Sequence, residues 1–160
     1  MNMNKKMVIV GIIFIVVLAC IIISKRKESL SFKITRYMNN NYTGNKIEIE
    51  LKEFTNFEWD KVLIYEYPTS AQEIVEALGI DKYEGNLDLM SGVIFVKEDK
   101  IVYEEIFKQD YVSTPRFYIY ASKKTSLYEN NRVFTYENSQ FEGLKKDDTG
   151  YAYYHLRPSH

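Results

Sequence analysis

The sequence predicts an α+β protein with an N-terminal transmembrane helix followed by a small, mostly antiparallel sheet with one or two packed helices. Seventeen consecutive residues without a polar or charged side chain, residues 7–23, predict the transmembrane helix. Segments in which β-branched and aromatic residues alternate with polar ones predict the strands. A capped amphipathic stretch predicts a helix lying on the sheet. We divide the chain into a tail at 1–6, a transmembrane anchor at 7–24, a juxtamembrane segment with a first helix at 25–45, and an α+β domain at 46–160.

The anchor would be about 25 Å long at roughly 1.5 Å per residue, slightly less than a bilayer core of about 30 Å. Basic residues flank it on both sides and can reach the lipid headgroups: Lys5, Lys6, Lys25, Arg26 and Lys27. Because these charges nearly balance, orientation is predicted from the short N-terminal tail, which favours an extracytoplasmic domain in a single-pass, signal-anchored protein. An alternative comes from residues 17–20, Val-Leu-Ala-Cys, which resemble a lipobox and would make Cys20 a lipidated anchor.

The elements of the domain follow from periodicity and caps. Apolar positions at residues 29–41 lie on one helical face, although a strand is the alternative there. Residues 46–51 alternate as a strand with one wet face, and residues 61–67 form a central strand ended by Pro68. A capping box begins a helix at Ser70, and the left-handed conformation of a glycine ends it at Gly79.

The second half of the domain is predicted to be strands and loops. Residues 92–107 form a hairpin turning at Glu98-Asp99, and because this pair is not favoured in two-residue turns, a longer loop stays open. Three more strands and two exposed loops are predicted: strands at 117–121, 132–136 and 151–156, and loops at 123–131 and 139–149.

The segment FEWDKVLIYEYP at residues 57–68, with the short helix and hairpin that follow, resembles a family of small membrane-anchored proteins or lipoproteins of Gram-positive bacteria. The resemblance covers roughly residues 46–107 and depends mainly on Trp59-Asp60-Lys61. The chain departs from the family pattern at Tyr67-Pro68, where Pro-Tyr is usual, and at Glu98-Asp99, where a glycine is usual. The resemblance implies an α+β fold in a bacterial envelope setting and brings no activity with it.

Charge and composition exclude several classes of function. Of the 21 Lys and Arg residues, five lie in residues 1–27, so the other 16 face all 22 acidic residues in residues 28–160, a net charge of −6. Such a domain lacks the basic surface of a nucleic-acid-binding protein. Its lack of cysteine excludes disulfides, thiolate zinc sites and cysteine nucleophiles. Two histidines are too few to predict a metal site, so we expect no metal and no cofactor.

Three sets of residues are candidate sites. Trp59, Asp60 and Lys61 can form a recognition edge with Trp59 as anchor, although packing by Trp59 and a turn cap by Asp60 are the more common roles. His155 can be a general base, but no nucleophile and acid at suitable spacing accompany it. Tyrosines on several strands can form an exposed face for glycan or peptide, or can be half-buried packing: Tyr118, Tyr120, Tyr136, Tyr151, Tyr153 and Tyr154.

These observations predict a membrane-anchored bacterial protein with a small, non-catalytic, extracytoplasmic interaction domain and no catalytic residue. Its expected partners are the lipid bilayer and another envelope protein or glycan, and no nucleic acid. The alternative is an envelope hydrolase that uses clustered carboxylates, with Glu104, Glu105 and Asp60 as candidates.

Overall fold

A computed structural model of the chain describes residues 28–44, 46–85, 87, 91–107, 116–122, 131–148 and 150–159. Two helices, two short 3₁₀ turns and eight strands follow one another in this part: α2 (Leu30–Asn41), β1 (Ile47–Glu50), η1 (Leu51–Phe54), β2 (Lys61–Tyr65), α3 (Ala71–Leu78), β3 (Ser91–Lys97), β4 (Lys100–Phe107), β5 (Arg116–Ile119), β6 (Asn131–Thr135), η2 (Tyr136–Asn138), β7 (Gln140–Asp148) and β8 (Tyr151–Pro158).

The predicted fold class is wrong in its transmembrane part. Within the described residues, no helix has the length and apolar character needed to cross a membrane. The longer helix, α2, has 12 residues and so spans about 18 Å, well short of a bilayer core of about 30 Å. These residues instead form a sheet-rich α+β fold with two helices. The predicted anchor at 7–24 and the alternative lipidation site Cys20 lie outside the described residues. The membrane location stays a prediction.

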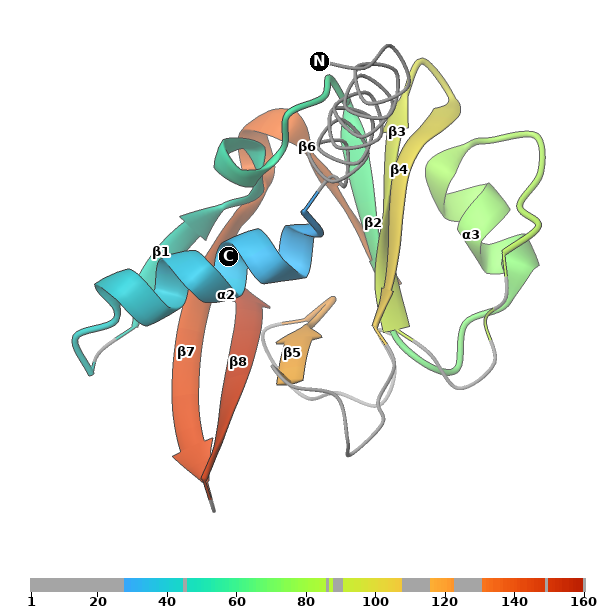
Figure 1. Ribbon diagram of the computed structural model, residues 1–160. Coiled ribbons are helices and arrows are strands. Elements are labelled where there is room, and N and C mark those ends of the chain that lie inside the picture. Colours follow the sequence, from blue (N-terminus) through green and yellow to red (C-terminus); the bar gives the residue numbers. More distant parts are fainter. Residues whose placement is uncertain are drawn as a thin grey trace, which may run out of the picture.

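The strands form two four-stranded sheets rather than the single sheet that was predicted (Figure 1). Sheet A has the order β1-β7-β8-β5 and sheet B the order β4-β3-β2-β6. All pairs are antiparallel except β5 with β8, which run parallel. Parallel pairing places Arg116 beside Tyr153 and Tyr118 beside His155. This register brings their side chains together on the outer face of sheet A.

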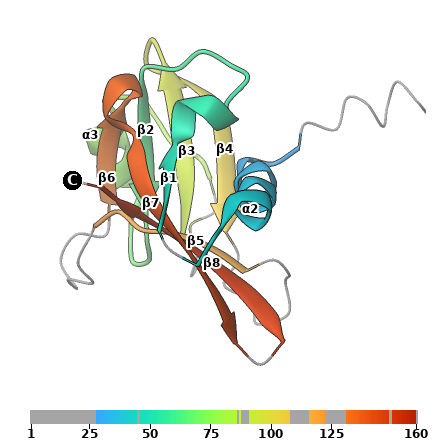
Figure 2. The same cartoon turned by 90° about the vertical axis from the view of Figure 1, so that its left-hand side faces the viewer.

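The main core lies between the two sheets and is closed on one side by α2 (Figures 1 and 2). Helix α2 contributes Leu30, Ile34 and Met38 to it. A second core lies on the other face of sheet B, where Ile74 and Leu78 of α3 pack against that sheet. Both faces of sheet B and the inner face of sheet A are therefore covered. In the described part of the chain, neither helix packs on the outer face of sheet A.

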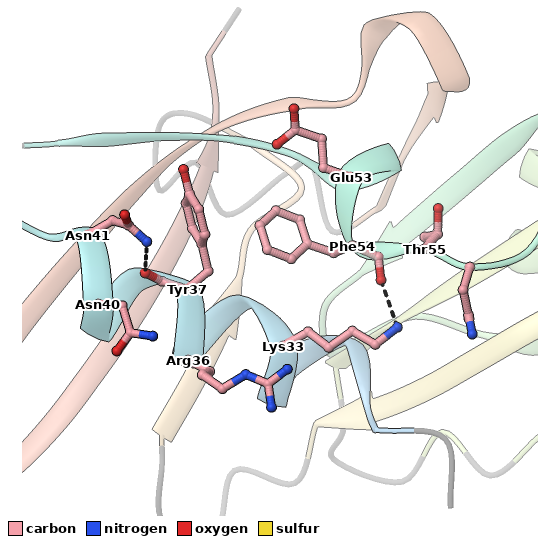
Figure 3. A pocket seen from close by; sticks show the side chains of 9 residues that line it. Lys33, Arg36, Tyr37, Asn40, Asn41, Glu53, Phe54 and Thr55 are labelled. Carbon is pink, nitrogen blue, oxygen red and sulfur yellow. Dashed lines mark hydrogen bonds between the residues drawn. The ribbon is translucent and has the colours of Figure 1, made fainter. Parts of the chain in front are cut away.

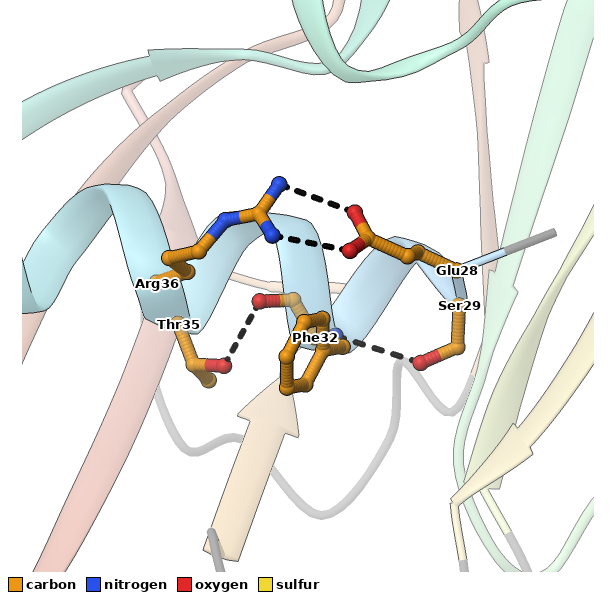
Figure 4. Close-up of polar contacts among 5 residues, drawn as sticks. All are labelled: Glu28, Ser29, Phe32, Thr35 and Arg36. Atoms are coloured by element: carbon orange, nitrogen blue, oxygen red, sulfur yellow. Dashed lines mark hydrogen bonds and ion pairs between the residues drawn. The ribbon is translucent and has the colours of Figure 1, made fainter. Parts of the chain in front are cut away.

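Helix α2 is stabilised by polar contacts near its N-terminus and by close packing on sheet A. Ser29 caps its N-terminus. The Arg36 guanidinium donates one hydrogen bond to each carboxylate oxygen of Glu28, and both are 2.8 Å long (Figure 4). At Gly143 on β7 a Cβ atom would lie 2.9 Å from Cε of Met38 and 2.8 Å from Cγ2 of Ile47. Only a glycine therefore lets α2 and β1 pack this closely on β7.

Local sequence signals are confirmed at α3 and corrected elsewhere. Helix α3 has the predicted capping box between Ser70 and Glu73 and ends at Gly79 with φ 67°. The turn between β3 and β4 has only the two residues Glu98 and Asp99, with φ 49° and 61°, so the longer loop is not formed. Strand β7 occupies most of the segment that was predicted to be a loop at 139–149, because it pairs with both β1 and β8.

Candidate functional site

Trp59 is buried between sheet B and the 3₁₀ turn η2. Only 3% of it is exposed, its ring packs edge-on against Phe95 at 5.0 Å, and it also contacts Tyr136 at 5.0 Å. Its indole Nε1 donates to Oγ1 of Thr55 at 3.0 Å. Trp59 therefore has the packing role, with its indole N–H satisfied inside the domain.

Asp60 and Lys61 are tied to the β3–β4 turn. The Asp60 carboxylate accepts from Nζ of Lys97 at 2.9 Å and from the backbone N–H of Glu98 at 2.8 Å. These two hydrogen bonds, that of Glu98 foremost, lower the pKa of Asp60. Lys61 Nζ lies 3.5 Å from Oδ1 of Asp99. Both residues thus fasten the entrance of β2 to the neighbouring hairpin.

Trp59 and Asp60 nevertheless line an open groove of about 570 Å³, which we call the Trp59 groove. Three aromatic residues, Phe57, Trp59 and Tyr136, line it, and its other lining residues are Glu58, Asp60, Lys97, Thr135 and Glu137. Tyr136 is 41% exposed. In the described chain, the exposed carboxylates of Glu58 and Glu137 have neither a hydrogen bond nor an ion pair. The groove combines an aromatic wall with unpaired negative charge; Lys61 does not line it.

A second depression, of about 450 Å³, lies between α2 and η1 (Figure 3). The ring of Tyr37 packs edge-on against Phe54 at 5.3 Å across it. Its two cations have partners within the chain: Lys33 Nζ donates to the carbonyl of Phe54 at 3.0 Å, and Arg36 pairs with Glu28. This depression therefore joins α2 to η1, and both of its cations are engaged in contacts within the chain.

The three carboxylates proposed for a hydrolase do not come together. Glu104 and Glu105 are neighbours on β4 and so point to opposite faces of sheet B, while Asp60 lies at the β3–β4 turn. Glu104 accepts from the hydroxyl of Tyr83, and burial followed by this bond raises the pKa of Tyr83. Glu105 accepts from the N–H of Leu30 at 2.7 Å. Each acid has a structural partner of its own.

His155 lies in a continuous stack on the outer face of sheet A. Its imidazole is parallel to the ring of Tyr118 at 5.2 Å and to that of Tyr120 at 5.9 Å, and its Nδ1 is 2.9 Å from the Tyr120 hydroxyl. Burial first, then the charges of Lys146 and Arg157, lower the pKa of His155. The imidazole is thus neutral at pH 7, and its neighbours are tyrosines and cations rather than a nucleophile.

The stack continues on both sides of His155. Tyr153 is parallel to Tyr118 at 6.5 Å, and the Arg116 guanidinium lies 4.9 Å from the ring centres of both Tyr151 and Tyr153. At the other end Arg157 lies 5.2 Å from the ring of Tyr120. We call these seven side chains the aromatic column; in spatial order they are Tyr151, Arg116, Tyr153, Tyr118, His155, Tyr120 and Arg157.

Four of the six tyrosines considered from the sequence therefore share one face, and two do not. Tyr154 is buried on the inner face and its hydroxyl donates to Oδ1 of Asn39 at 2.6 Å, while Tyr136 belongs to the Trp59 groove. Sequence reasoning missed Arg116 and Arg157. Their signal was the spacing of two, which places Arg116 on the face of Tyr118 and Arg157 on the face of His155.

The described residues contain no group of three or more His, Cys, Asp or Glu side chains that could hold a metal ion. Comparison of the chain with protein-family models, with curated proteins and with solved structures finds no match. The resemblance at residues 57–68 therefore remains a sequence prediction, and function has to be argued from the two surfaces described above, the Trp59 groove and the aromatic column.

Proposed function

We propose that this protein is a non-catalytic interaction domain that binds a basic segment of another envelope protein in the Trp59 groove. The observation that carries the proposal is the juxtaposition of the Tyr136 ring with the unpaired carboxylates of Glu58 and Glu137 in one groove. A lysine or arginine side chain satisfies both features, because its stem packs on aromatic rings and its cation pairs with carboxylates.

The aromatic residues of the groove are held by contacts within the domain. The ring of Tyr136 contacts Trp59, and the backbone N–H of Tyr136 donates to the carbonyl of Asp60 at 3.0 Å. Phe57 is fixed by an edge-on contact with Phe95 at 5.4 Å and by stacking on Tyr103 at 5.1 Å. A wall positioned in this way loses little conformational entropy when a partner binds.

Electrostatics favour a cationic partner over an anionic one. Lys97 pairs with Asp60 and also interacts electrostatically with Glu58, so three carboxylates of the groove, with Glu137 the third, face one lysine and the groove is net negative. Nearby Lys52 is paired with Glu50 at 2.6 Å and does not offset them. The net charge of −6 on residues 28–160 adds long-range attraction for a basic segment, which raises the association rate at low salt.

Peptide binding tests this function. A fluorescently labelled peptide with alternating Gly and Arg is titrated with the full-length protein, and its anisotropy is compared with that of a Gly-Glu peptide. We expect binding of the Arg peptide only, weakened about tenfold or more by the double substitution Glu58→Gln and Glu137→Gln. Glu48→Gln with Glu53→Gln removes two exposed charges elsewhere and is the matched control. Equal loss of affinity in both double variants would show that the peptide responds only to the net charge of the protein, and it would refute a site in the groove.

A further inference from the structure

The chain carries a basic segment of its own close to the Trp59 groove. We propose that this segment, Lys25-Arg26-Lys27, occupies the groove of the same molecule until a partner displaces it. The inference rests on the proposed function, because it adds a second occupant of the same groove and makes the site autoinhibited. Residues 1–27 contain five basic residues and no acid, and three of the five are the consecutive residues of this basic segment.

The N-terminal end of α2 lies beside β4, close to the groove (Figure 1). The backbone N–H of Leu30 donates to the hydroxyl of Tyr103 at 3.0 Å and to Glu105 at 2.7 Å, both on β4. The ring of Tyr103 stacks in turn on the ring of Phe57, with 5.1 Å between the ring centres. Phe57 lines the Trp59 groove. Two consecutive contacts therefore connect the first residue of α2 with a lining residue of the groove.

The chain that precedes α2 is long enough to bring the basic segment to the groove. Five residues, 25–29, lie before Leu30, and an extended chain covers roughly 3.5 Å per residue, so the backbone of Lys25 can reach about 17 Å from Leu30. The long side chains of lysine and arginine extend this reach. A tether this short gives the segment an effective concentration on the order of millimolar at the groove. A weak contact is therefore sufficient to keep the groove occupied.

The charges of the groove and of the basic segment are complementary. Three carboxylates line the groove, those of Glu58, Asp60 and Glu137, and they face a single lysine. The basic segment supplies three cations in three consecutive residues. The acid that follows it directly, Glu28, is engaged by Arg36 at 2.8 Å. The segment therefore offers the net negative groove the same chemistry as the basic peptide of a partner.

Zero-length cross-linking of the full-length protein tests the proposal without any partner. A water-soluble carbodiimide joins a lysine amine to a carboxylate only where the two groups are in contact. Mass spectrometry of the monomer band is expected to find Lys25 or Lys27 joined to Glu58, Asp60 or Glu137, with a yield that falls at high salt. Links confined to the dimer band would show that the segment enters the groove of a second copy. Absence of links to these carboxylates would leave the segment to the lipid headgroups, and either result would overturn the proposal.

Affinity for the labelled Gly-Arg peptide separates this inference from the proposed function. In the basic-segment variant all three cations are replaced, by Lys25→Gln, Arg26→Gln and Lys27→Gln. The apparent affinity of a ligand falls with the fraction of molecules whose site is open, so a groove that is about nine-tenths occupied binds the peptide about tenfold more weakly. The basic-segment variant is therefore expected to bind the peptide about tenfold more tightly than the wild type in the anisotropy titration.

A matched control removes three positive charges away from the groove. Lys46→Gln with Lys82→Gln and Lys146→Gln changes three exposed lysines, none of which lines the groove, and should leave the affinity within about twofold of the wild type. A gain in the basic-segment variant no larger than that of the control would refute autoinhibition and leave the proposed function standing. Failure of the peptide to bind to the basic-segment variant would refute the proposed function itself.

Discussion

The imidazole of His155 stacks on the ring of Tyr118, with 5.2 Å between the ring centres and 13° between the planes. Tyr120 is parallel to His155 at 5.9 Å. Because burial and the nearby cations Lys146 and Arg157 lower the pKa of His155, the folded domain holds a neutral imidazole at a place where the unfolded chain would accept a proton more readily.

This arrangement predicts that acid destabilises the domain through His155. The unfolded pKa of histidine is about 6.5, and the folded value is lower, so the unfolded chain binds more protons between the two. The contribution of His155 to the free energy of unfolding is therefore fully present above about pH 6.5. It is lost as the pH falls from there through the lower pKa that His155 has in the folded domain. Urea unfolding of the wild type and of His155→Gln, at pH 7.5 and pH 5.5, checks this. The difference in free energy between the two proteins should shrink at pH 5.5; a constant difference would contradict the expected titration.

Glu105 is predicted to hold the N-terminus of α2 on sheet B. Its carboxylate accepts from the N–H of Leu30 at 2.7 Å, from the hydroxyl of Tyr103 at 2.6 Å, and from the hydroxyl of Ser31. Glu105→Ala leaves these donors without their acceptor and is expected to lower the free energy of unfolding by about 1–3 kcal/mol. Chemical denaturation measures it, with the exposed Glu53→Ala as control. A loss no larger than that of the control would show that Glu105 does not fasten α2.

Gly143 is predicted to be required for the packing of α2 on sheet A. The Cβ of an alanine would meet Cε of Met38 at 2.9 Å and Cγ2 of Ile47 at 2.8 Å. Gly143→Ala is therefore expected to cost about 1–3 kcal/mol of unfolding free energy. Met38→Leu, which removes the Cε atom, should recover part of that loss in the double variant, so the two effects should not add. Strict additivity of the two substitutions would contradict a direct clash.

The β3–β4 turn is predicted to be improvable. Glu98 and Asp99 both have positive φ, the conformation of a type I′ turn, which Asn and Gly adopt at lower cost. Replacing them together, Glu98→Asn and Asp99→Gly, should raise the free energy of unfolding by about 1 kcal/mol, because the positive φ angles then cost less. The hydrogen bond from the backbone N–H of residue 98 to Asp60 is kept in this variant. Thermal unfolding monitored by circular dichroism checks it. A lower melting temperature would mean that the Asp99–Lys61 contact outweighs the backbone gain.

Elements specified by neighbouring residues could be predicted from the sequence. The helix between Ser70 and Gly79 was predicted with its capping box and its C-terminal glycine, because both signals act within one or two helical turns. Strand β1, Ile47–Glu50, lies within the strand predicted from alternation at residues 46–51, although Leu51 begins the 3₁₀ turn η1 instead. Trp59 is buried, as packing requires, and it also lines the Trp59 groove, so the recognition role weighed from the sequence stays a prediction.

Features that depend on distant pairing could not be predicted in this way. Strand β7 has charged residues at 145–148 and a glycine at 143, a composition typical of a loop; it is a strand because β1 and β8 flank it. The division into two sheets and the parallel β5–β8 pair depend on the same long-range choices. The aromatic column requires that register, and the Trp59 groove requires Tyr136 to return beside Trp59.

Emission of the single tryptophan tests the central claim most directly. Trp59 contacts Tyr136 and lines the proposed groove, so a basic peptide bound there changes its surroundings without any introduced label. The full-length protein titrated with the Gly-Arg peptide is predicted to show a saturable change in Trp59 emission, with the same midpoint as the anisotropy titration. Glu58→Gln with Glu137→Gln should shift that midpoint about tenfold to higher peptide concentration. Peptide binding detected by anisotropy with no change in Trp59 emission would place the partner elsewhere and contradict the account.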